Sequence, residues 1–238
     1  MNLACRRIIA LLIAVALTTG VPVVGDTLGQ RDDHQNKTIY LTFDDGPSNK
    51  VTTKILNILK EKGVKGTFFI VGCKIEGREQ VLKKIVNEGH AIGLHSYTHN
   101  YKKIYGDSKQ LINEMNLTQK EIRQVTGKSY NVIRFPAGSS PHLNASLLNK
   151  LHARGYKIYD WNASLSDGLD YKISPDRLVE EATKVFGRKS RVILLMHCDD
   201  VNVNTCRALP EIIDHYRKLG YEFKTITEDT KEYYFRFD

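Results

Sequence analysis

Two adjacent carboxylates, Asp44 and Asp45, follow a short run of β-branched and aromatic residues that begins at Lys37. This run predicts a strand, and the Gly-Pro pair directly after the carboxylates predicts its end. Asp-Asp-Gly-Pro is also common in water-exposed turns. The stretch by itself therefore leaves an ordinary turn and a catalytic carboxylate pair both open.

Two histidines, His95 and His99, follow another probable strand and stand four residues apart. A histidine pair alone is more often part of a polar surface than a metal site. With a carboxylate from another strand end, two neutral imidazoles make a three-ligand site with an open position for water. One residue of the Asp44–Asp45 pair would then be a ligand of zinc or a similar divalent ion, and the other could act as a base. Neither an HExxH pattern nor a zinc-finger spacing is present.

Three further strand ends carry polar groups. His197, directly after an apolar run, is the leading candidate for the acid that protonates a departing amine. Arg134 and Asp160 can orient the two proton-transfer groups, although a surface ion pair or a strand-end cap would explain each of them singly. Trp161, the only tryptophan, could be part of the core or stack against a sugar ring. Together these groups suit hydrolysis of an amide by a metal-activated water.

The elements that must position these groups alternate between strands and helices. Probable strands span residues 38–43, 66–71, 90–94, 131–135, 156–160, 191–196 and 221–226. Apolar residues at helical spacing separate them, and this alternation predicts a parallel sheet with helical crossovers. Because no Gly-rich phosphate loop follows the first strand, we expect a barrel, incompletely closed, rather than a nucleotide-binding sheet. The carboxyl ends of parallel barrel strands open on one face, so the five polar clusters would meet in one pocket.

Composition is that of one globular domain, with 41% hydrophobic and 26% charged residues among 238. The formal net charge of +8 suits an anionic partner such as a bacterial wall, a membrane surface or nucleic acid, and does not choose among them.

The N-terminus has the pattern of a secretory leader. Arg6 and Arg7 precede an apolar run over residues 8–17, which is shorter than a membrane span of roughly 20 residues. We expect a cleavable signal over residues 1–25, with an uncleaved anchor as the alternative, a polar tether over residues 26–36, and a catalytic domain over residues 37–238. The protein would then be secreted or associated with the cell wall.

Three cysteines remain outside the leader: Cys73, Cys198 and Cys206. Their odd number leaves at least one unpaired in a monomer. Cys198 and Cys206 flank a short loop and could form a disulfide outside the cell.

The five clusters, taken in order, resemble the five motifs of the NodB-homology polysaccharide deacetylases, carbohydrate esterase family four. The matching segments are Thr42-Phe43-Asp44-Asp45-Gly46, His95-Ser96-x-x-His99, Arg134-x-Pro136, Asp160-Trp161 and Leu195-x-His197. The resemblance covers essentially the whole chain after Lys37. It implies a distorted (β/α)7 barrel and an enzyme that removes N- or O-acetyl groups from sugars. It also implies a divalent metal ion, with zinc expected first and cobalt or nickel as the alternatives.

The resemblance also implies a role for each matched residue. Asp44 would be the base, oriented by Arg134, and His197 would be the acid, supported by Asp160. The second aspartate and both histidines of the motifs would hold the metal: Asp45, His95 and His99. The acetyl pocket would be lined by Trp161 and Leu195.

The third motif departs from the family. Its proline is usually followed by tyrosine, and here that position is Ala137. Alanine keeps the backbone N–H that the family places at the oxyanion but lacks the side-chain contacts to substrate, so the departure bears on substrate identity more than on catalysis.

We therefore expect a metal-dependent hydrolase that removes N-acetyl groups from amino sugars of a polysaccharide, with peptidoglycan favoured by the leader and the basic charge. Deacetylation of chitin-like oligomers or O-acetylated xylan is the alternative among enzymes. A catalytically silent wall-binding module is the alternative among binding proteins, and the retained Asp44, Arg134 and His197 argue against it. Nucleic acid is not expected as a partner, because charge alone supports it. The oligomeric state is left open.

Overall fold

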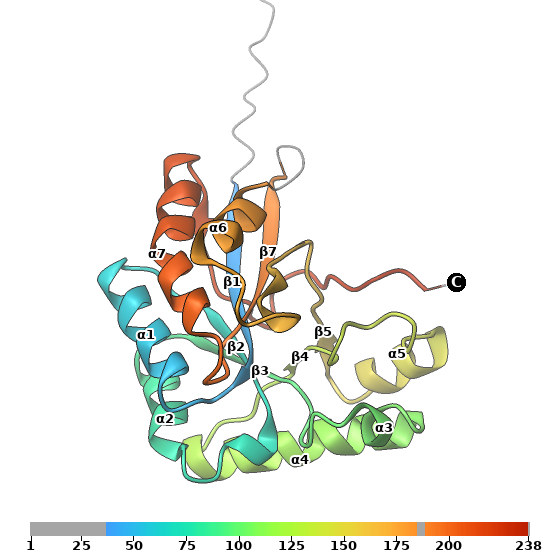
Figure 1. Cartoon of the computed structure of the whole chain (residues 1–238). Coiled ribbons are helices and arrows are strands. Elements are labelled where there is room, and N and C mark those ends of the chain that lie inside the picture. The colour runs from blue at the N-terminus through green and yellow to red at the C-terminus, as the bar shows by residue number, and fades with distance from the viewer. Residues whose placement is uncertain (1–36, 185–188, 238) are drawn as a thin grey trace, which may run out of the picture. The chain divides into compact units, whose positions relative to one another are not determined.

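The structure, a computed structural model, describes residues 37–184 and 189–237 (Figure 1). The signal or anchor and the polar tether expected over residues 1–36 lie outside the described residues. Within the described part of the chain, no helix is long and apolar enough to cross a membrane.

Among the described residues, eight parallel strands form one curved sheet in the order β5-β4-β3-β2-β1-β7-β6, with β8 also paired to β1. The strands are β1 (Thr38–Gly46), β2 (Thr67–Ile70), β3 (Ala91–Leu94), β4 (Val132–Ile133), β5 (Lys157–Ile158), β6 (Ala163–Ser164), β7 (Arg191–His197) and β8 (Glu222–Phe223). In this order β5 and β6 are the two ends and do not pair with each other. The sheet is therefore a half-barrel, which confirms the expected barrel that does not fully close.

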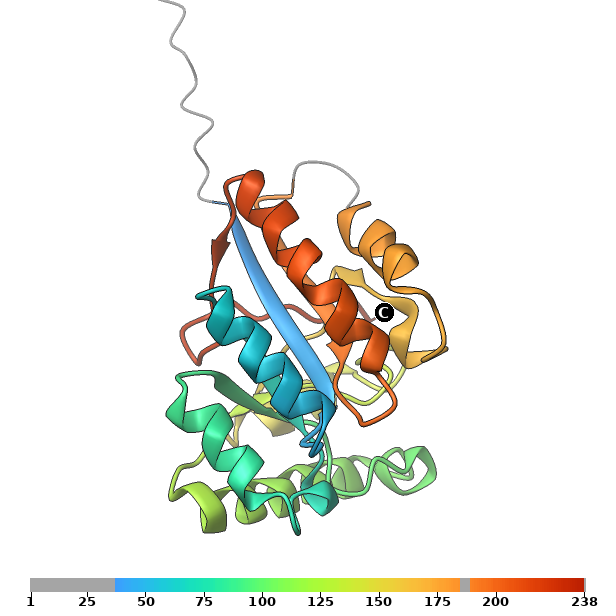
Figure 2. The same cartoon turned by 60° about the vertical axis from the view of Figure 1, so that its left-hand side comes forward.

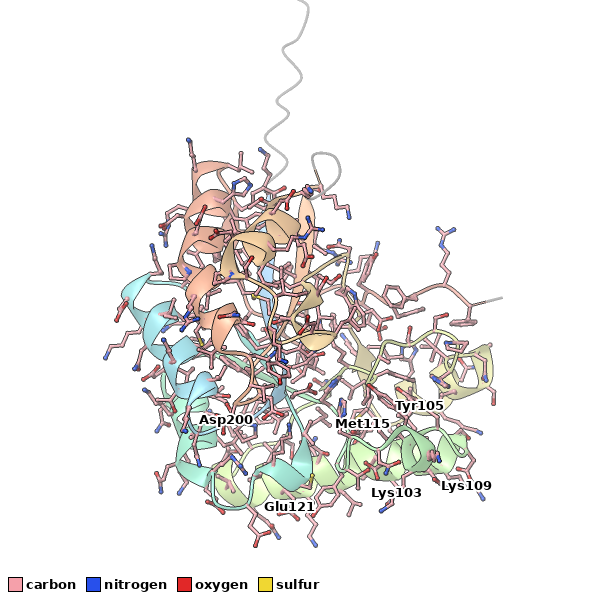
Figure 3. All side chains as sticks on the ribbon, in the orientation of Figure 1. Lys103, Tyr105, Lys109, Met115, Glu121 and Asp200 are labelled. Carbon is pink, nitrogen blue, oxygen red and sulfur yellow. The ribbon has the colours of Figure 1, made fainter. Side chains whose placement is uncertain are left out.

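Helices cover the outer face of this sheet. They are α1 (Val51–Glu61), α2 (Glu79–Asn87), α3 (Tyr101–Ile104), α4 (Ser108–Thr126), α5 (Ala145–His152), α6 (Pro175–Thr183) and α7 (Val203–Lys218), with single 3-10 turns η1 (Gly72–Lys74) and η2 (Ser166–Gly168). Figure 2 shows α1 and α7 side by side over β1, and these two helices pack on each other. Charged side chains such as Lys103, Lys109 and Glu121 lie along the outer edge of α3 and α4 (Figure 3).

Local chemistry sets where several helices begin and end. The side chain of Asp107 accepts hydrogen bonds from the first backbone N–H groups of α4, and Gly127 ends the same helix with a φ of 71°. Ser174 caps α6, whose first residue is Pro175, as the Ser-Pro pair predicts.

The central strand β1 determines which side chains face the site. Ile39, Leu41 and Phe43 are fully buried against the helices, and Tyr40 belongs to a second buried cluster on the other face of the sheet. Because side chains alternate along a strand, Asp44 lies on the same face as Tyr40, inside the half-barrel. The alternation of apolar residues therefore aims the first carboxylate at the interior.

All seven strands expected from the sequence are present, and β6 is an additional one. The strand β6 has two residues and no apolar run, so it carries no periodic signal. It pairs with β7 next to the carboxyl end of that strand, through Ser164 opposite Leu195. The strand that sequence reasoning missed therefore adds to the wall of the site.

Candidate active site

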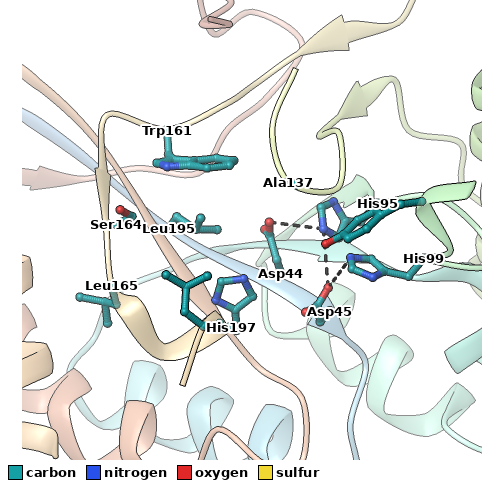
Figure 4. Close-up of a pocket in the computed structure, with 13 residues that line it drawn as sticks. Asp44, Asp45, His95, His99, Ala137, Trp161, Ser164, Leu165, Leu195 and His197 are labelled. Carbon is teal, nitrogen blue, oxygen red and sulfur yellow. Dashed lines mark ion pairs between the residues drawn. The ribbon is translucent and has the colours of Figure 1, made fainter. Parts of the chain in front are cut away.

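The carboxyl ends of the strands open on a pocket of about 370 Å³ (Figure 4). Eight of the ten residues expected at the site line it: Asp44, Asp45, His95, His99, Ala137, Trp161, Leu195 and His197. The other two, Arg134 and Asp160, are fully buried. Residues separated by more than 150 positions thus meet, as the convergence of parallel strand ends predicts.

The register of β1 and β7 brings the two expected proton-transfer groups together. Asp44 is paired with His197 across this ladder, and Thr42 is paired with Leu195. The side chains of directly paired residues in neighbouring strands project from the same face. A carboxylate and an imidazole are therefore placed on one side of the sheet by backbone pairing alone.

Three side chains offer donor atoms for one cation. Donor atoms of Asp45, His95 and His99 all lie within 4.8 Å of one another. Oδ1 of Asp45 is 3.1 Å from Nε2 of His99 and 3.6 Å from Nε2 of His95. This Oδ1 is buried and has no hydrogen-bond partner among the described residues, which is the situation that a bound cation would relieve. Two imidazoles and one carboxylate fit zinc or a similar divalent ion.

His95 is held in the tautomer that a ligand needs. Its Nδ1 lies 3.0 Å from the carbonyl oxygen of Arg134, which can only accept, so Nδ1 carries the proton and Nε2 presents a lone pair. Burial lowers the pKa of His95 below its ordinary value, against the raising effect of Asp44 and Asp45. The imidazole is therefore neutral and aimed at the donor cluster.

Asp45 is ionised in this setting. Burial by itself would raise its pKa, but the contact with His99 and the electrostatic interactions with His95, His99 and His197 outweigh that effect, so the pKa lies below its usual range. A carboxylate rather than a carboxylic acid thus faces the two imidazoles, as metal binding requires.

Backbone strain is concentrated at this site. Among the described residues, four residues other than glycine have a positive φ: Asp45 (69°), Ser96 (66°), His99 (53°) and Ala137 (63°). Each belongs to one of the first three motifs. Such conformations cost about 1–3 kcal/mol each and persist only where the surroundings hold them.

A buried acid of α4 holds the loop that carries the two histidines. Oε2 of Glu114 accepts hydrogen bonds from the backbone N–H groups of Tyr97, at 2.9 Å, and Thr98, at 2.7 Å. The hydroxyl of Ser96 accepts a further bond from the N–H of His99 at 3.1 Å. These bonds satisfy the backbone donors of a loop that has no ladder partners and fix its left-handed turns.

Asp44 and Arg134 form the buried ion pair expected from their motifs. Nη1 of Arg134 donates to Oδ1 of Asp44 at 2.8 Å, and both side chains are almost wholly buried. The guanidinium also donates to the carbonyl of Tyr159 at 2.7 Å and the hydroxyl of Thr42 at 2.8 Å, and it lies 4.0 Å from the centre of the Phe69 ring. Removing one partner would leave a buried charge uncompensated, which costs about 3–5 kcal/mol.

The carboxylate beside His197 is that of Asp167, so the expectation that Asp160 supports His197 is corrected. Nδ1 of His197 lies 2.9 Å from Oδ1 of Asp167, and the backbone N–H of His197 donates to Oδ2 at 2.9 Å. The hydroxyl of Thr205 also donates to Oδ2, at 2.7 Å. Asp167 lies in η2, directly after the strand β6 that the sequence did not predict.

This pairing keeps His197 protonated. Burial would lower its pKa, but the hydrogen bond and charge of Asp167, with the more distant Asp44 and Asp45, raise it from 6.5 to about 9. An imidazolium at neutral pH is the form that can donate a proton.

One glycine lets η2 lie against this imidazole. A Cβ on Gly168 would stand 2.3 Å from Cε1 and 2.6 Å from Nε2 of His197, closer than any side chain tolerates. In the sequence, the Asp-Gly pair at residues 167–168 indicates only a turn, and it does not identify the side chain that the carboxylate contacts.

Asp160 makes contacts of a different kind. Its carboxylate accepts hydrogen bonds from the backbone N–H and the hydroxyl of Ser139, at 3.0 and 2.5 Å, and from the backbone N–H of Phe235, at 2.7 Å. It faces the loop after β4 and the C-terminal residues, and the contacts of its carboxylate do not include His197. The sequence correctly places Asp160 at the end of a strand. The direction of its side chain, however, depends on segments that are remote in sequence.

The cysteine pair considered above is not formed. Cys198 and Cys206 are both buried and free. Sγ of Cys198 contacts the carbonyl oxygen of Asp44 at 3.1 Å, whereas Sγ of Cys206 lies 3.8 Å from the carbonyl oxygen of Val51. The two thiols thus have different partners, and of the two possibilities that the sequence left open, the structure has free cysteines.

The half-barrel and this site together define a metal-dependent hydrolase: a donor cluster for one divalent ion, a buried carboxylate–arginine pair and an imidazolium share one pocket. Comparison with known proteins agrees. The family model described as polysaccharide deacetylase matches residues 31–159.

Three relatives illustrate the similarity. The chain is 35% identical over 202 residues to a peptidoglycan-N-acetylglucosamine deacetylase of Bacillus cereus, covering 82% of this chain and 71% of that protein. It is 32% identical to the peptidoglycan-N-acetylmuramic acid deacetylase PdaA of Bacillus subtilis, covering 82% of this chain and 72% of that protein. The crystal structure of a polysaccharide deacetylase from Bacillus cereus superposes with a TM-score of 0.76 at 35% identity, with 82% and 94% covered.

The chain therefore belongs to the polysaccharide deacetylase family, the NodB-homology enzymes of carbohydrate esterase family four. Members of this family are hydrolases that use a divalent metal, and the residues of the donor cluster fit such an ion.

Proposed function

We propose that this protein removes N-acetyl groups from the amino sugars of peptidoglycan. The observation that carries the proposal is the cluster of donor atoms from Asp45, His95 and His99 in the same pocket as the paired Asp44 and His197. Two of the relatives named above act on peptidoglycan according to their names. The net charge of +8 supports an anionic wall as the place of action.

Each side chain of the pocket has a proposed task. Asp45, His95 and His99 would hold zinc, or cobalt or nickel in its place, and a bound metal lowers the pKa of water and polarises a carbonyl. Asp44, oriented by Arg134, takes the proton of the attacking water, and the imidazolium of His197 gives a proton to the departing amine.

The remaining expected residues form the acetyl-binding wall in this proposal. Trp161 and Leu195 contact the acetyl group, and the backbone N–H of Ala137 donates to the oxyanion. Alanine at this position leaves the wall open where the family usually has a tyrosine, so a bulkier sugar substituent, such as the lactyl group of N-acetylmuramic acid, has room beside it.

Acetate release tests the proposal. The wild-type protein should release acetate from purified peptidoglycan faster than from chitin oligomers or acetylated xylan. Chelation should abolish release, and added zinc or cobalt should restore it. Faster release from chitin oligomers or xylan would contradict peptidoglycan as the substrate. Acetate release that is unaffected by chelation would overturn the metal-dependent mechanism.

A base variant separates the enzyme from a silent wall-binding module. Asp44→Asn keeps the shape of the side chain but removes the base, so acetate release should fall by about 100-fold or more. Binding to peptidoglycan in a sedimentation assay should persist. A wild-type protein that binds the wall and releases acetate no faster than Asp44→Asn would favour the binding module.

We also propose that residues 1–25 are a secretory signal or an N-terminal anchor, residues 26–36 a tether, and residues 37–238 the catalytic domain. Expression in a bacterial host followed by mass spectrometry of the mature N-terminus tests this arrangement. A cleaved chain in the medium supports a signal, an uncleaved chain in the membrane fraction supports an anchor through residues 8–17, and a cytoplasmic chain with an intact N-terminus would contradict both.

A further inference from the structure

The last residues of the chain run along the open side of the half-barrel, and we call residues 231–237 the C-terminal strap (Figure 1). Nη1 of Arg191, the first residue of β7, donates to the carbonyl oxygen of Lys231 at 2.9 Å. Tyr233 then forms a parallel bridge with Tyr159, just beyond β5, and its carbonyl oxygen accepts from the N–H of Asp160 at 2.6 Å. The strap is therefore attached to both β7 and the β5 edge, where the sheet does not close on itself.

Asp160 ties this strap to the loop after β4. Its fully buried carboxylate accepts three hydrogen bonds, two from Ser139 of that loop and one from the N–H of Phe235 in the strap. The carbonyl oxygen of Asp160 accepts a further bond from Nη2 of Arg134 at 3.2 Å. One buried acid thus connects the strap, the loop after β4, which contains Ala137, and the arginine that pairs with Asp44.

The side chain of Phe235 packs against the wall of the pocket. Its ring meets the Trp161 ring edge to face, with centroids 5.2 Å apart and planes at 80°. A Cβ on Gly138 would stand 2.8 Å from Cε2 of Phe235 and 3.1 Å from Cη2 of Trp161, so the backbone at this glycine is pressed between the two rings. Trp161, which lines the pocket, therefore packs on the strap, and the strap also lies against Gly138, the neighbour of Ala137 in the chain.

We propose that Asp160 and Phe235 are positioning residues of the deacetylation site, and that the C-terminal strap sets the place of Trp161 and of the Ala137 backbone. This inference rests on the proposed function for its kinetic consequences, but the dependence of Trp161 on the strap can be measured without any substrate. It also gives Asp160 a task that does not involve His197.

Phe235→Ala is the central variant, because it removes the ring that supports Trp161 while keeping the backbone N–H that donates a hydrogen bond to Asp160. Trp161 is the only tryptophan, so tryptophan fluorescence reports on the surroundings of this one residue. We expect emission to shift to longer wavelength, quenching by acrylamide to increase, and kcat to fall about tenfold or more, since small misplacements of a substrate wall are costly. Affinity for zinc should stay within about twofold, because the donor cluster lies on β1 and the loop after β3.

Two further variants serve as controls. Phe237→Ala alters the same strap at a ring that stacks on Tyr234, with centroids 6.2 Å apart, and should leave fluorescence and kcat unchanged. Phe235→Tyr keeps the aromatic ring and should retain most of the wild-type kcat and quenching.

Asp160→Asn distinguishes a positioning role from a proton-transfer role. It weakens the three hydrogen bonds, so kcat should fall, while the pH at which activity declines on the alkaline side should stay that of the wild type. A shift of this alkaline limb to lower pH would mean that Asp160 acts on His197, and would overturn the assignment.

Other outcomes would also overturn the inference. Unchanged quenching in Phe235→Ala would show that Trp161 does not rest on the strap, whatever the enzyme acts on. Changed quenching with wild-type kcat would show that the strap packs on the tryptophan without positioning the site. If the wild type released no acetate from any substrate while the fluorescence changes occurred, the proposed function would fail and the structural dependence of Trp161 would stand.

Discussion

At the scale of single residues, several residues of the site have backbone conformations that are unfavourable for L-amino acids. Ala137 has a φ of 63°, a region that costs an L-residue about 1–2 kcal/mol and costs glycine nothing. The side chain at this position is a methyl group, and its proposed contribution is the backbone N–H. The conformation, rather than the side chain, is therefore what the site needs here.

Ala137→Gly should increase the free energy of unfolding, by up to about 1 kcal/mol, because the removed strain exceeds the added entropy of the unfolded chain. Acetate release should be retained, since the N–H remains. Urea denaturation measures the first effect. A decrease in the free energy of unfolding would mean that the methyl group makes contacts worth more than the strain.

The pairing of His197 with Asp167 predicts how activity depends on pH. His197 must be protonated to act as an acid, so activity should decline as the pH rises through its pKa of about 9. Asp167→Asn removes the adjacent negative charge and should move this alkaline limb down by about 1–2 pH units. A pH profile of kcat/KM that is the same for both proteins would contradict the role of Asp167.

The same pair affects stability with a definite sign. The pKa of His197 in the folded protein, about 9, lies above its unfolded value of 6.5. Its contribution to folding stability is therefore complete below pH 6.5 and is lost as the pH rises towards 9. The stability advantage of the wild type over Asp167→Asn should shrink across this range, as denaturation at several pH values would measure.

At the scale of elements, helix α4 controls the geometry of the loop after β3. Glu114 reaches from α4 to the backbone between His95 and His99, so the helix fixes the distance between two of the three metal-binding candidates. Residues that orient ligands in this way commonly change metal affinity when they are replaced.

Glu114→Ala should weaken zinc binding by about 10- to 100-fold, because the N–H groups of Tyr97 and Thr98 lose their acceptor and the loop relaxes. Titration with the metal measures this directly. Glu121→Ala, which removes a partly exposed acid two helical turns further along α4, is the matched control and should bind zinc as the wild type does. Equal affinity in both variants would show that the loop keeps its shape without the helix.

At the scale of the whole molecule, the half-barrel connects the donor cluster to overall stability. Strand β1 lies inside the sheet and carries Asp45 just before its last residue, while β3 leads to the two histidines. A cation that binds these side chains binds the folded sheet and not the unfolded chain, so it stabilises the domain by mass action.

Zinc should therefore raise the melting temperature. At a free concentration 100 times its Kd the gain is about 2.7 kcal/mol of unfolding free energy. Asp45→Asn removes the charged donor and should reduce this shift strongly, which calorimetry can measure without substrate. A melting temperature independent of zinc in the wild type would mean that the cluster does not hold the metal.

The sequence by itself determined the sheet, its incomplete closure and the meeting of the motif residues in one pocket. Alternation of strands and helices dictates parallel pairing, and parallel pairing brings strand ends such as Asp44 and His197 to the same edge. Only the tertiary structure decided that Asp167 contacts His197, that Asp160 holds the C-terminal strap, and that Cys198 and Cys206 stay apart. The physical reason is that the alternation of strands and helices follows from local patterns, whereas the partner of a buried side chain depends on which remote segments pack against it. A two-residue strand such as β6 is too short to show a periodic pattern in the sequence.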